Sequence, residues 1–223
     1  MIDIVKVKNR QDGNLKAHDI LKDIVDEKTL LALSGGTSLD YKKMFVEPGD
    51  VMPGAICVVD ERYGEPFHKD SNEFLLKEAG IKKFADDNCI ETHKILIGEN
   101  IFETEKAYDK LISALFKKFP KKVGVMGVGA NLHTAGIFPY SAATKSADYV
   151  AAEEVEDKFA KRVTLTLKAL GEFNNFVILM FGKEKEEAFK KILSDDETNM
   201  PAYPAIFYRK YPQKTYLITD INL

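Results

Sequence analysis

The chain has 223 residues, of which 45% are hydrophobic, and its formal net charge is −3. A chain of this length and composition can bury a substantial core, so it needs no metal or disulfide to fold. Its slightly acidic balance disfavours a nucleic-acid-binding surface, which requires a basic face. No stretch approaches the roughly 18–20 apolar residues of a membrane helix. We therefore expect neither nucleic acid nor a membrane as a partner.

The first ten residues, MIDIVKVKNR, lack the apolar segment of a signal peptide. The chain has two cysteines, and Cys57 lies in the apolar run AICVV, which is typical of a small buried side chain. The sequence contains no Cys-x-x-Cys pair and no Cys/His spacing of the kind that binds zinc, so we expect no zinc site. We expect a cytoplasmic protein without metal or other cofactor. Because no repeat, low-complexity tract or linker interrupts the sequence, we expect residues 1–223 to form a single domain.

Four short, almost wholly apolar runs recur along the chain, and such runs are typical of strands covered on both faces of a parallel sheet. Helical patterns lie between them, as in 102–119, where the apolar residues form one stripe of period 3.6. The expected elements, in chain order, are a helix over 14–27, strands over 30–33 and 55–59, a helix over 102–119, a strand over 123–126, an alternating strand from 162, a strand over 176–181 and a helix over 184–193. This alternation predicts an α/β fold with a mostly parallel, doubly wound sheet.

Three loops leave the carboxyl ends of these strands, which is where open α/β sheets bind ligands. The first contains SGGT, residues 34–37, and is expected to lead into a helical segment whose first N–H groups can hold a phosphate. Taken alone, this tetrapeptide is more often an ordinary turn. It is not a Walker loop, because no Gly-Lys-Ser/Thr follows it.

The second loop is the irregular stretch 60–70, which begins with Asp60, Glu61 and Arg62. Two acids at a strand end can move protons, whereas a carboxylate beside an arginine is more often a solvated ion pair or a loop tie. Asp70 or Ser71 is expected to cap the helix that follows.

The third loop, 127–147, holds His133, one of only four histidines in the chain. Its start, GVG at 127–129, is similar to a dinucleotide-binding loop, but leucine stands where G-x-G-x-x-G needs its third glycine, which disfavours a nicotinamide cofactor. His133 is either a structural histidine or a base at the mouth of the sheet. Arg162 begins an alternating, strand-like segment. Lys185 is a candidate phosphate partner, because it is expected in the first turn of a helix, where a cation needs an anion beside it. A solvated Lys185 side chain, or Lys183 in its place, is the simpler alternative.

In this order, the motifs resemble the family of 6-phosphogluconolactonases and glucosamine-6-phosphate deaminases. The resemblance runs through SGGT (34–37), DER to DSN (60–72), HTAGIFP (133–139), RVTLTL (162–167) and GKEK (182–185) to Asp220. It implies a three-layer α/β/α sandwich with a Rossmann-like sheet, in agreement with the order of elements. The chain is similar to the lactonases after the histidine, where it has Thr134. The deaminases carry a catalytic glutamate in the segment that follows, and Gly136–Pro139 contains no carboxylate.

The resemblance implies hydrolysis of 6-phosphoglucono-δ-lactone to 6-phosphogluconate, a step of the pentose phosphate pathway, by a water that His133 activates without a metal. Arg62 is then expected to stabilise the oxyanion, and Asp60 to organise Arg62. Asn131 is expected to orient the histidine. The residues implied for binding the phosphate are Ser34, Gly35, Gly36, Thr37, Arg162 and Lys185.

Two departures stand next to the histidine. The family usually has Asp-Gly before it, and this chain has Asn131 and Leu132. The amide of Asn131 can accept a hydrogen bond but carries no charge, and leucine restricts a bend that glycine would permit. Two alternatives therefore stay open: a sugar-phosphate-binding protein with weak catalysis, and a deaminase or isomerase that uses Asp60 as the base. We expect a monomer or a weak homo-oligomer.

Overall fold

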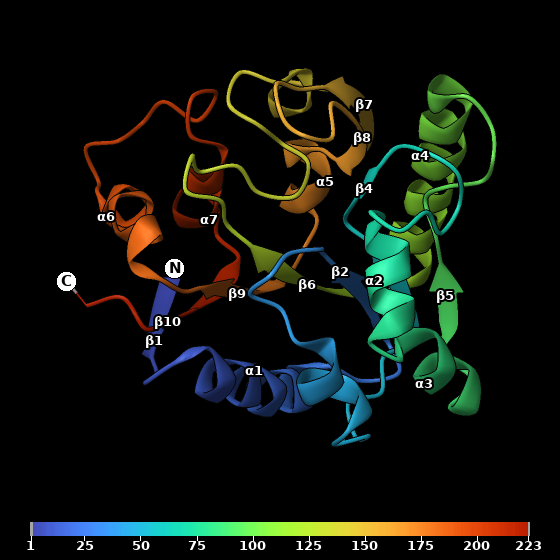
Figure 1. Ribbon diagram of the computed structural model, residues 1–223, viewed down its shortest axis with the longest axis horizontal. Coiled ribbons are helices and arrows are strands. Elements are labelled where there is room, and N and C mark those ends of the chain that lie inside the picture. Colours follow the sequence, from blue (N-terminus) through green and yellow to red (C-terminus); the bar gives the residue numbers. More distant parts are fainter. Residues whose placement is uncertain (1, 223) are drawn as a thin grey trace.

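A seven-stranded sheet forms the centre of the protein (Figure 1), whose structure, a computed structural model, describes residues 2–222. The strand order is β1-β10-β9-β6-β2-β3-β5, and all neighbouring strands are parallel. The strands are β1 (Ile2–Lys6), β2 (Thr29–Leu33), β3 (Ala55–Val58), β5 (Glu91–His93), β6 (Lys121–Gly127), β9 (Asn175–Met180) and β10 (Lys214–Thr219).

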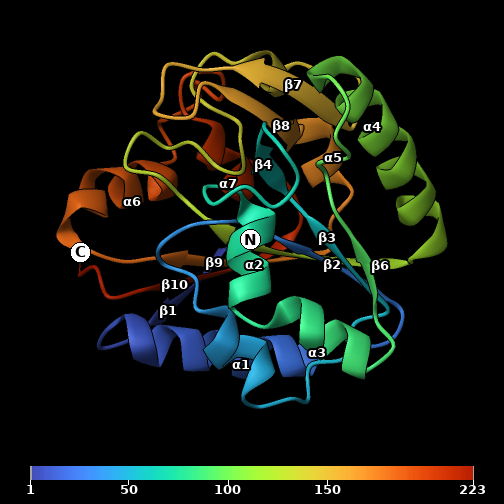
Figure 2. The ribbon, with the colours of Figure 1, turned by 45° about the vertical axis from the view of Figure 1, so that its right-hand side comes forward.

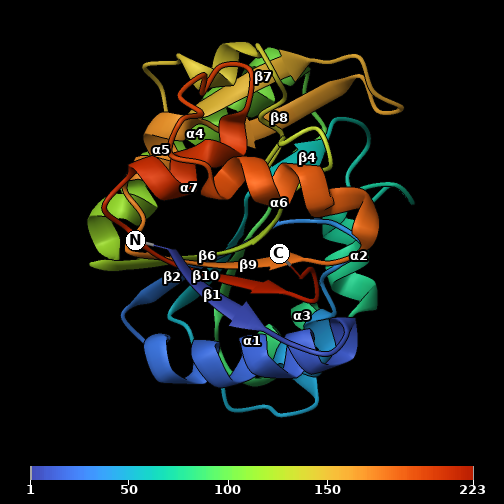
Figure 3. The same ribbon diagram turned by 90° about the vertical axis from the view of Figure 1, so that its left-hand side faces the viewer.

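Helices cover both faces of this sheet, which confirms the predicted three-layer, doubly wound architecture (Figures 1 and 3). One face carries α1 (Arg10–Ile24), the π-helical turn η1 (Lys42–Val46) and α3 (Ile81–Asp87). The other carries α4 (Ile101–Lys118), α5 (Leu167–Gly171), α6 (Glu186–Leu193) and α7 (Phe207–Lys210), with the short turns η2 (Ala142–Thr144), η3 (Lys183–Lys185) and η4 (Pro204–Ile206). A further helix, α2 (Asn72–Glu78), packs against α3.

A second, antiparallel sheet lies above the first on the side of α4 (Figure 2). Its strands are β4 (Asp60–Arg62), β8 (Lys161–Leu165) and β7 (Val150–Glu154), in the order β4-β8-β7. The expectation that 60–70 is irregular throughout is therefore wrong for its first three residues, because their backbone pairs with β8. This pairing brings the charged residues that follow β3 next to those that begin β8.

The apolar runs are buried for the reason predicted, since each strand has a layer on both faces. All five residues of β2 and the last five of β9 are buried. On α4 the stripe packs inward: Tyr108, Ile112 and Leu115 are at most 3% exposed. Each such side chain contributes about 1.5–3 kcal/mol to the free energy of folding.

Two helices begin elsewhere than predicted. Helix α1 starts at Arg10, because the side chain of Asn9 accepts a hydrogen bond from Asp12 N (3.0 Å) and caps it. Helix α6 starts only at Glu186, so Lys185 ends the turn η3 and is the N-cap of α6 rather than a residue of its first turn. The predicted cap of α2 is confirmed, since Ser71 Oγ accepts from Phe74 N at 3.0 Å.

The segment after β2 is a loop over 34–40, so the helical residues into which SGGT was predicted to lead begin only at Tyr41, just before η1. Gly36 has a φ of +131°, which glycine tolerates and other residues do not. Asn14 on α1 then satisfies the loop backbone: its Nδ2 donates to Ser38 O (3.2 Å), and its Oδ1 accepts from Asp40 N (2.8 Å). A side chain thus supplies the hydrogen bonds that a helical turn would have made.

Within residues 2–222, no helix combines the length and apolar character needed to cross a membrane. The single domain expected for residues 1–223 stays a prediction.

Candidate active site

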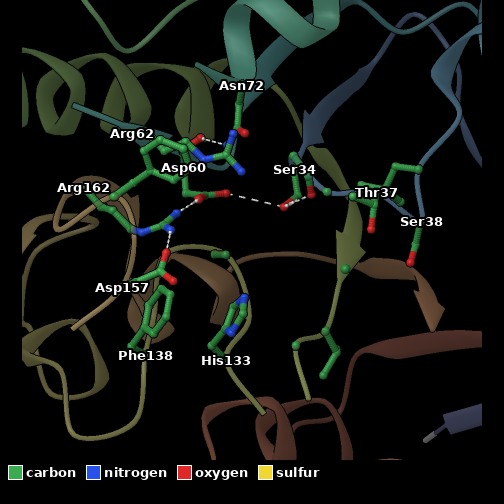
Figure 4. A pocket seen from close by; sticks show the side chains of 18 of the residues that line it. Ser34, Thr37, Ser38, Asp60, Arg62, Asn72, His133, Phe138, Asp157 and Arg162 are labelled. Atoms are coloured by element: carbon green, nitrogen blue, oxygen red, sulfur yellow. Dashed lines mark hydrogen bonds and ion pairs between the residues drawn. The ribbon is translucent and has the colours of Figure 1, made fainter. Parts of the chain in front are cut away.

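A pocket of about 380 Å³ opens at the carboxyl ends of the parallel strands (Figure 4). The loops that follow β2, β3, β6 and β9 all contribute to its wall, together with β8. Nine of the ten site residues predicted from the sequence line this pocket: Ser34, Gly35, Gly36, Thr37, Asp60, Arg62, His133, Arg162 and Lys185. The tenth, Asn131, does not line the pocket but contacts His133.

Asn131 fixes the orientation of the His133 ring. Its Oδ1 accepts a hydrogen bond from the backbone N–H of His133 (3.1 Å), so this atom is the oxygen of the amide. The same oxygen lies 2.6 Å from His133 Nδ1, which must therefore carry the proton of the neutral ring. The lone pair is left on Nε2, which is the arrangement a general base requires.

Neighbouring residues hold the ring from its faces. The Phe138 ring stacks on His133 with the centroids 4.5 Å apart and an interplanar angle of 8°. Glycine is also needed at position 129, because a Cβ there would lie 2.2 Å from His133 Nδ1. Leu132 adopts a φ of +65° with its side chain buried, so the bend keeps a conformation that favours glycine even though leucine occupies it.

The pKa of His133 is lowered to about 4, first by burial and then by the positive charges of Arg162 and Lys185, while Asp157 opposes the shift. The imidazole is therefore neutral at neutral pH and able to accept a proton. Both cations that lower its pKa line the same pocket.

Two arginines stand opposite each other in the small sheet. Arg62 on β4 and Arg162 on β8 are directly paired in the antiparallel register, and both line the pocket. Like charges in such a position destabilise a sheet unless something of opposite charge lies near them. The Nε atoms of both side chains are buried and have no hydrogen-bond partner among residues 2–222. The pair is therefore suited to bind an anion.

Asp60 contacts Arg162 rather than Arg62, contrary to prediction. Its Oδ2 lies 3.6 Å from Arg162 Nη1, and its Oδ1 accepts from Ser34 Oγ at 3.4 Å. Burial raises the pKa of the Asp60 carboxyl, against the opposing charges of Arg162 and Arg62. Arg62 instead donates from Nη1 to Asp70 O (2.7 Å), because the loop after β4 folds back over it.

The loop 34–37 presents free donors to the pocket even though it begins no helix. Within residues 2–222, the backbone N–H groups of Gly35, Gly36 and Thr37 donate no hydrogen bond. Lys185 lines the same pocket, and burial lowers the pKa of its ammonium group. These groups together form a positively polarised wall beside His133.

Sequence reasoning missed several lining residues. Asn72 is 2% exposed, its Nδ2 donates to Asp60 O (2.8 Å), and its Oδ1 has no partner among residues 2–222. Gly35 leaves room for this amide, since a Cβ there would lie 2.0 Å from Asn72 Oδ1. The Ser71 cap, which places Asn72 at the start of α2, was a usable signal. The other missed residues are Ser38, Leu39, Gly127, Val128, Gly129, Ala135, Phe138, Asp157, Lys158 and Phe159.

The sequence of residues 15–215 matches the family described as glucosamine-6-phosphate isomerases/6-phosphogluconolactonase. The chain belongs to this family. A 6-phosphogluconolactonase of Neisseria meningitidis serogroup A is 27% identical over 194 residues, which cover 82% of this chain and 83% of that protein. A 6-phosphogluconolactonase of Xylella fastidiosa (strain Temecula1) is 29% identical over 188 residues, with 79% and 77% covered.

Solved structures share the fold across almost the whole chain. The 6-phosphogluconolactonase of Leishmania guyanensis superposes with a TM-score of 0.80 at 19% identity, covering 98% of this chain and 96% of that one. A monomeric glucosamine-6-phosphate deaminase gives the same TM-score at 16% identity, with 97% of both chains covered. The fold alone thus does not separate the two activities, whereas the curated relatives support an enzyme of the 6-phosphogluconolactonase type.

Proposed function

We propose that the protein hydrolyses 6-phosphoglucono-δ-lactone to 6-phosphogluconate, with His133 as the general base. The observation that carries the proposal is the paired arginines of β4 and β8 beside a histidine whose Nε2 is free to accept a proton. A phosphorylated lactone brings two groups that need such donors: the phosphoryl group from the start, and the carbonyl oxygen once it becomes an oxyanion.

In this proposal the phosphoryl group binds the N–H groups of Gly35, Gly36 and Thr37, and Arg162 and Lys185 neutralise its charge. The lactone carbonyl then lies toward Arg62. The free donors of the loop and the unpartnered Nε atoms of the two arginines support this orientation.

Water attacks the lactone carbonyl while His133 Nε2 takes its proton. The tetrahedral intermediate places its negative charge next to Arg62. The ring C–O bond then breaks, and the imidazolium returns the proton to the leaving ring oxygen, which becomes the hydroxyl of 6-phosphogluconate. The step consumes one water and regenerates the neutral histidine.

Substrate binding also improves the base. Arg162 and Lys185 contribute to the low pKa of His133 in the free enzyme. A phosphoryl dianion between these two cations offsets their charge, so the pKa of His133 rises toward the working pH when substrate binds. A base whose pKa lies nearer that pH abstracts a proton more readily in the transition state.

The deciding experiment measures the loss of freshly prepared 6-phosphogluconolactone above its spontaneous rate. His133→Ala should lower kcat/KM by about 10²–10⁴, the usual contribution of a positioned general base. His18→Ala is the matched control, because it removes an imidazole that contacts Met44 O on the opposite side of the fold. Full activity in His133→Ala would contradict the assignment of the base.

The two alternatives give different results in the same preparation. Binding of 6-phosphogluconate without hydrolysis of the lactone would indicate a binding protein. Release of ammonia from glucosamine 6-phosphate, abolished by Asp60→Asn, would indicate a deaminase with Asp60 as the base. The absence of a carboxylate from Gly136–Pro139 favours the lactonase.

The reaction as proposed takes place in the cytoplasm, in a monomer or weak homo-oligomer, with a small phosphorylated lactone as partner and neither nucleic acid nor membrane. It uses no metal, since His133 and the two arginines supply the proton transfer and the positive charge. Activity that survives dialysis against EDTA would support this point, and loss restored by a divalent cation would contradict it.

A further inference from the structure

A second pocket, of about 360 Å³, lies between α2, α3 and the edge of the main sheet. Helices α2 and α3 lie side by side next to the edge strand β5, on the right of Figure 1. Among residues 2–222, no residue lines both this pocket and the first one. We call it the α2–α3 pocket.

The floor of the α2–α3 pocket is apolar. Ile56 and Val58 line it from β3, and Leu76 and Ile81 line it from the two helices. All four side chains are 7% exposed or less. An apolar cavity of this volume with a few polar groups in its wall is typical of a small-molecule site.

One buried carboxylate in this wall is only half satisfied. Glu73 is 4% exposed and lines the pocket. Its Oε1 accepts hydrogen bonds from Ile95 N (2.6 Å) and Leu96 N (2.8 Å), and its Oε2 has no partner among residues 2–222. Buried acceptors are normally paired, so Oε2 is positioned to accept a hydrogen bond from a molecule in the pocket.

The rim of the pocket is positively charged and aromatic. Lys77, Lys82 and Lys94 all line it. Phe67 is 39% exposed and has a φ of +59°, an unusual conformation for an aromatic residue. The ammonium groups of Lys94 and Lys77 lie 5.2 and 5.8 Å from the centroid of its ring. An exposed ring among cations suits a flat, negatively charged ligand.

We propose that the α2–α3 pocket binds an aromatic carboxylate that also carries an N–H or O–H donor. The aromatic body packs on Leu76 and Ile81, the donor reaches Glu73 Oε2, and the carboxylate lies among the rim lysines. This site is separate from the proposed catalytic one and does not depend on lactone hydrolysis.

Indole-3-acetate is the probe, because it combines an indole N–H with a carboxylate on a planar body. Calorimetry and amide-detected NMR titrations should show saturable binding, with shifts at Ile56, Glu73 and Leu76 that exceed those at Gly129 in the first pocket. Tryptamine has the same ring with a positive charge and should bind at least tenfold more weakly. Methylation of the indole nitrogen should weaken binding about tenfold, because Glu73 then receives no donor.

Variants locate the binding site. Leu76→Trp fills the pocket and should abolish binding, whereas Leu75→Trp, on the exposed side of the same helix turn, should not. Lys94→Gln should weaken binding of indole-3-acetate severalfold while leaving neutral 3-methylindole unaffected. Lys83→Gln is the matched control, since Lys83 is exposed and does not line the pocket.

Three results would overturn the proposal: no saturable binding of indole-3-acetate at millimolar concentration, equal affinity for tryptamine, or binding that Lys94→Gln leaves unchanged. Lys94 is exposed, so this variant remains informative if Leu76→Trp fails to fold. Because the readout is binding, its failure is distinguishable from a failure of the lactonase assay.

Discussion

Replacing Asn131 with aspartate puts a negative charge on an atom that already contacts His133, the proposed general base. Asn131 Oδ1 lies 2.6 Å from His133 Nδ1 and 3.1 Å from His133 N. Aspartate has the same shape as asparagine, so both hydrogen bonds can persist. We expect Asn131→Asp to raise the pKa of His133 and to increase turnover.

The size of the effect follows from the present balance of charges. Burial, Arg162 and Lys185 lower the pKa of His133 to about 4. A carboxylate within reach of an ionisable group typically shifts its pKa by roughly 1–3 units toward the charged form. The pKa should therefore rise to roughly 5–7, which still leaves much of the ring neutral at pH 7.5. With a Brønsted coefficient of about 0.5, the rate of proton abstraction should rise about 3- to 30-fold.

The assay is the pH profile of lactone hydrolysis under single-turnover conditions, with an NMR titration of the His133 ring in both proteins. In the His133→Ala background, Asn131→Asp should give no gain, since its effect passes through the imidazole. A lower turnover, or a His133 pKa that does not move, would refute this account of the Asn131–His133 pair and indicate that the site depends on the uncharged amide.

Five further outcomes are expected. In the wild-type enzyme, kcat should show a higher apparent pKa than kcat/KM, because bound phosphate offsets the cations near His133; equal values would contradict that placement of the phosphate. Gly129→Ala should lower kcat with little change in KM, since a Cβ would lie 2.2 Å from the His133 ring. Asp157→Asn should lower KM, because Asp157 Oδ2 holds Arg162 Nη2 at 2.5 Å in competition with substrate. In calorimetry the chain should unfold in one transition, as a single domain does. In the same experiment Glu61→Gln should reduce the free energy of unfolding by about 1–3 kcal/mol, because Glu61 accepts hydrogen bonds from three backbone N–H groups.

The sequence pattern predicts the layers of the fold, but it does not predict the order of the strands in the sheet. A run such as 176–181 is apolar because the strand is covered on both faces, and this alone predicts a buried parallel strand. The limits of α1 were missed because Asn9, not a residue near position 14, caps it. Asn14 lies within α1, yet its side chain holds the loop 34–40 through hydrogen bonds. This is a tertiary contact that no local sequence pattern encodes.

The candidate site residues that directly follow a strand could be predicted from the sequence, whereas those in irregular loops could not. His133, Arg62 and the loop 34–37 follow strands of one sheet, so topology alone brings them together. Asp157 lies in an irregular loop and enters the site only because β7 and β8 carry that loop over the pocket. That Asp60 pairs with Arg162 and not with Arg62 could not be predicted from the sequence either, because it depends on the register of β4 against β8.

The register of that small sheet places Arg62 opposite Arg162, so the proposed anion site forms independently of His133. Arg62 and Arg162 repel each other across the strands, and among residues 2–222 the carboxylates of Asp60 and Asp157 form ion pairs with Arg162. In the proposed function a phosphoryl group displaces Asp157 from Arg162, and because the Asp157 side chain is 38% exposed, it can turn into solvent at low cost. In this proposal the pairing of β4 with β8 fixes the positive charge that binds the substrate, and the residues beside His133 determine the reaction.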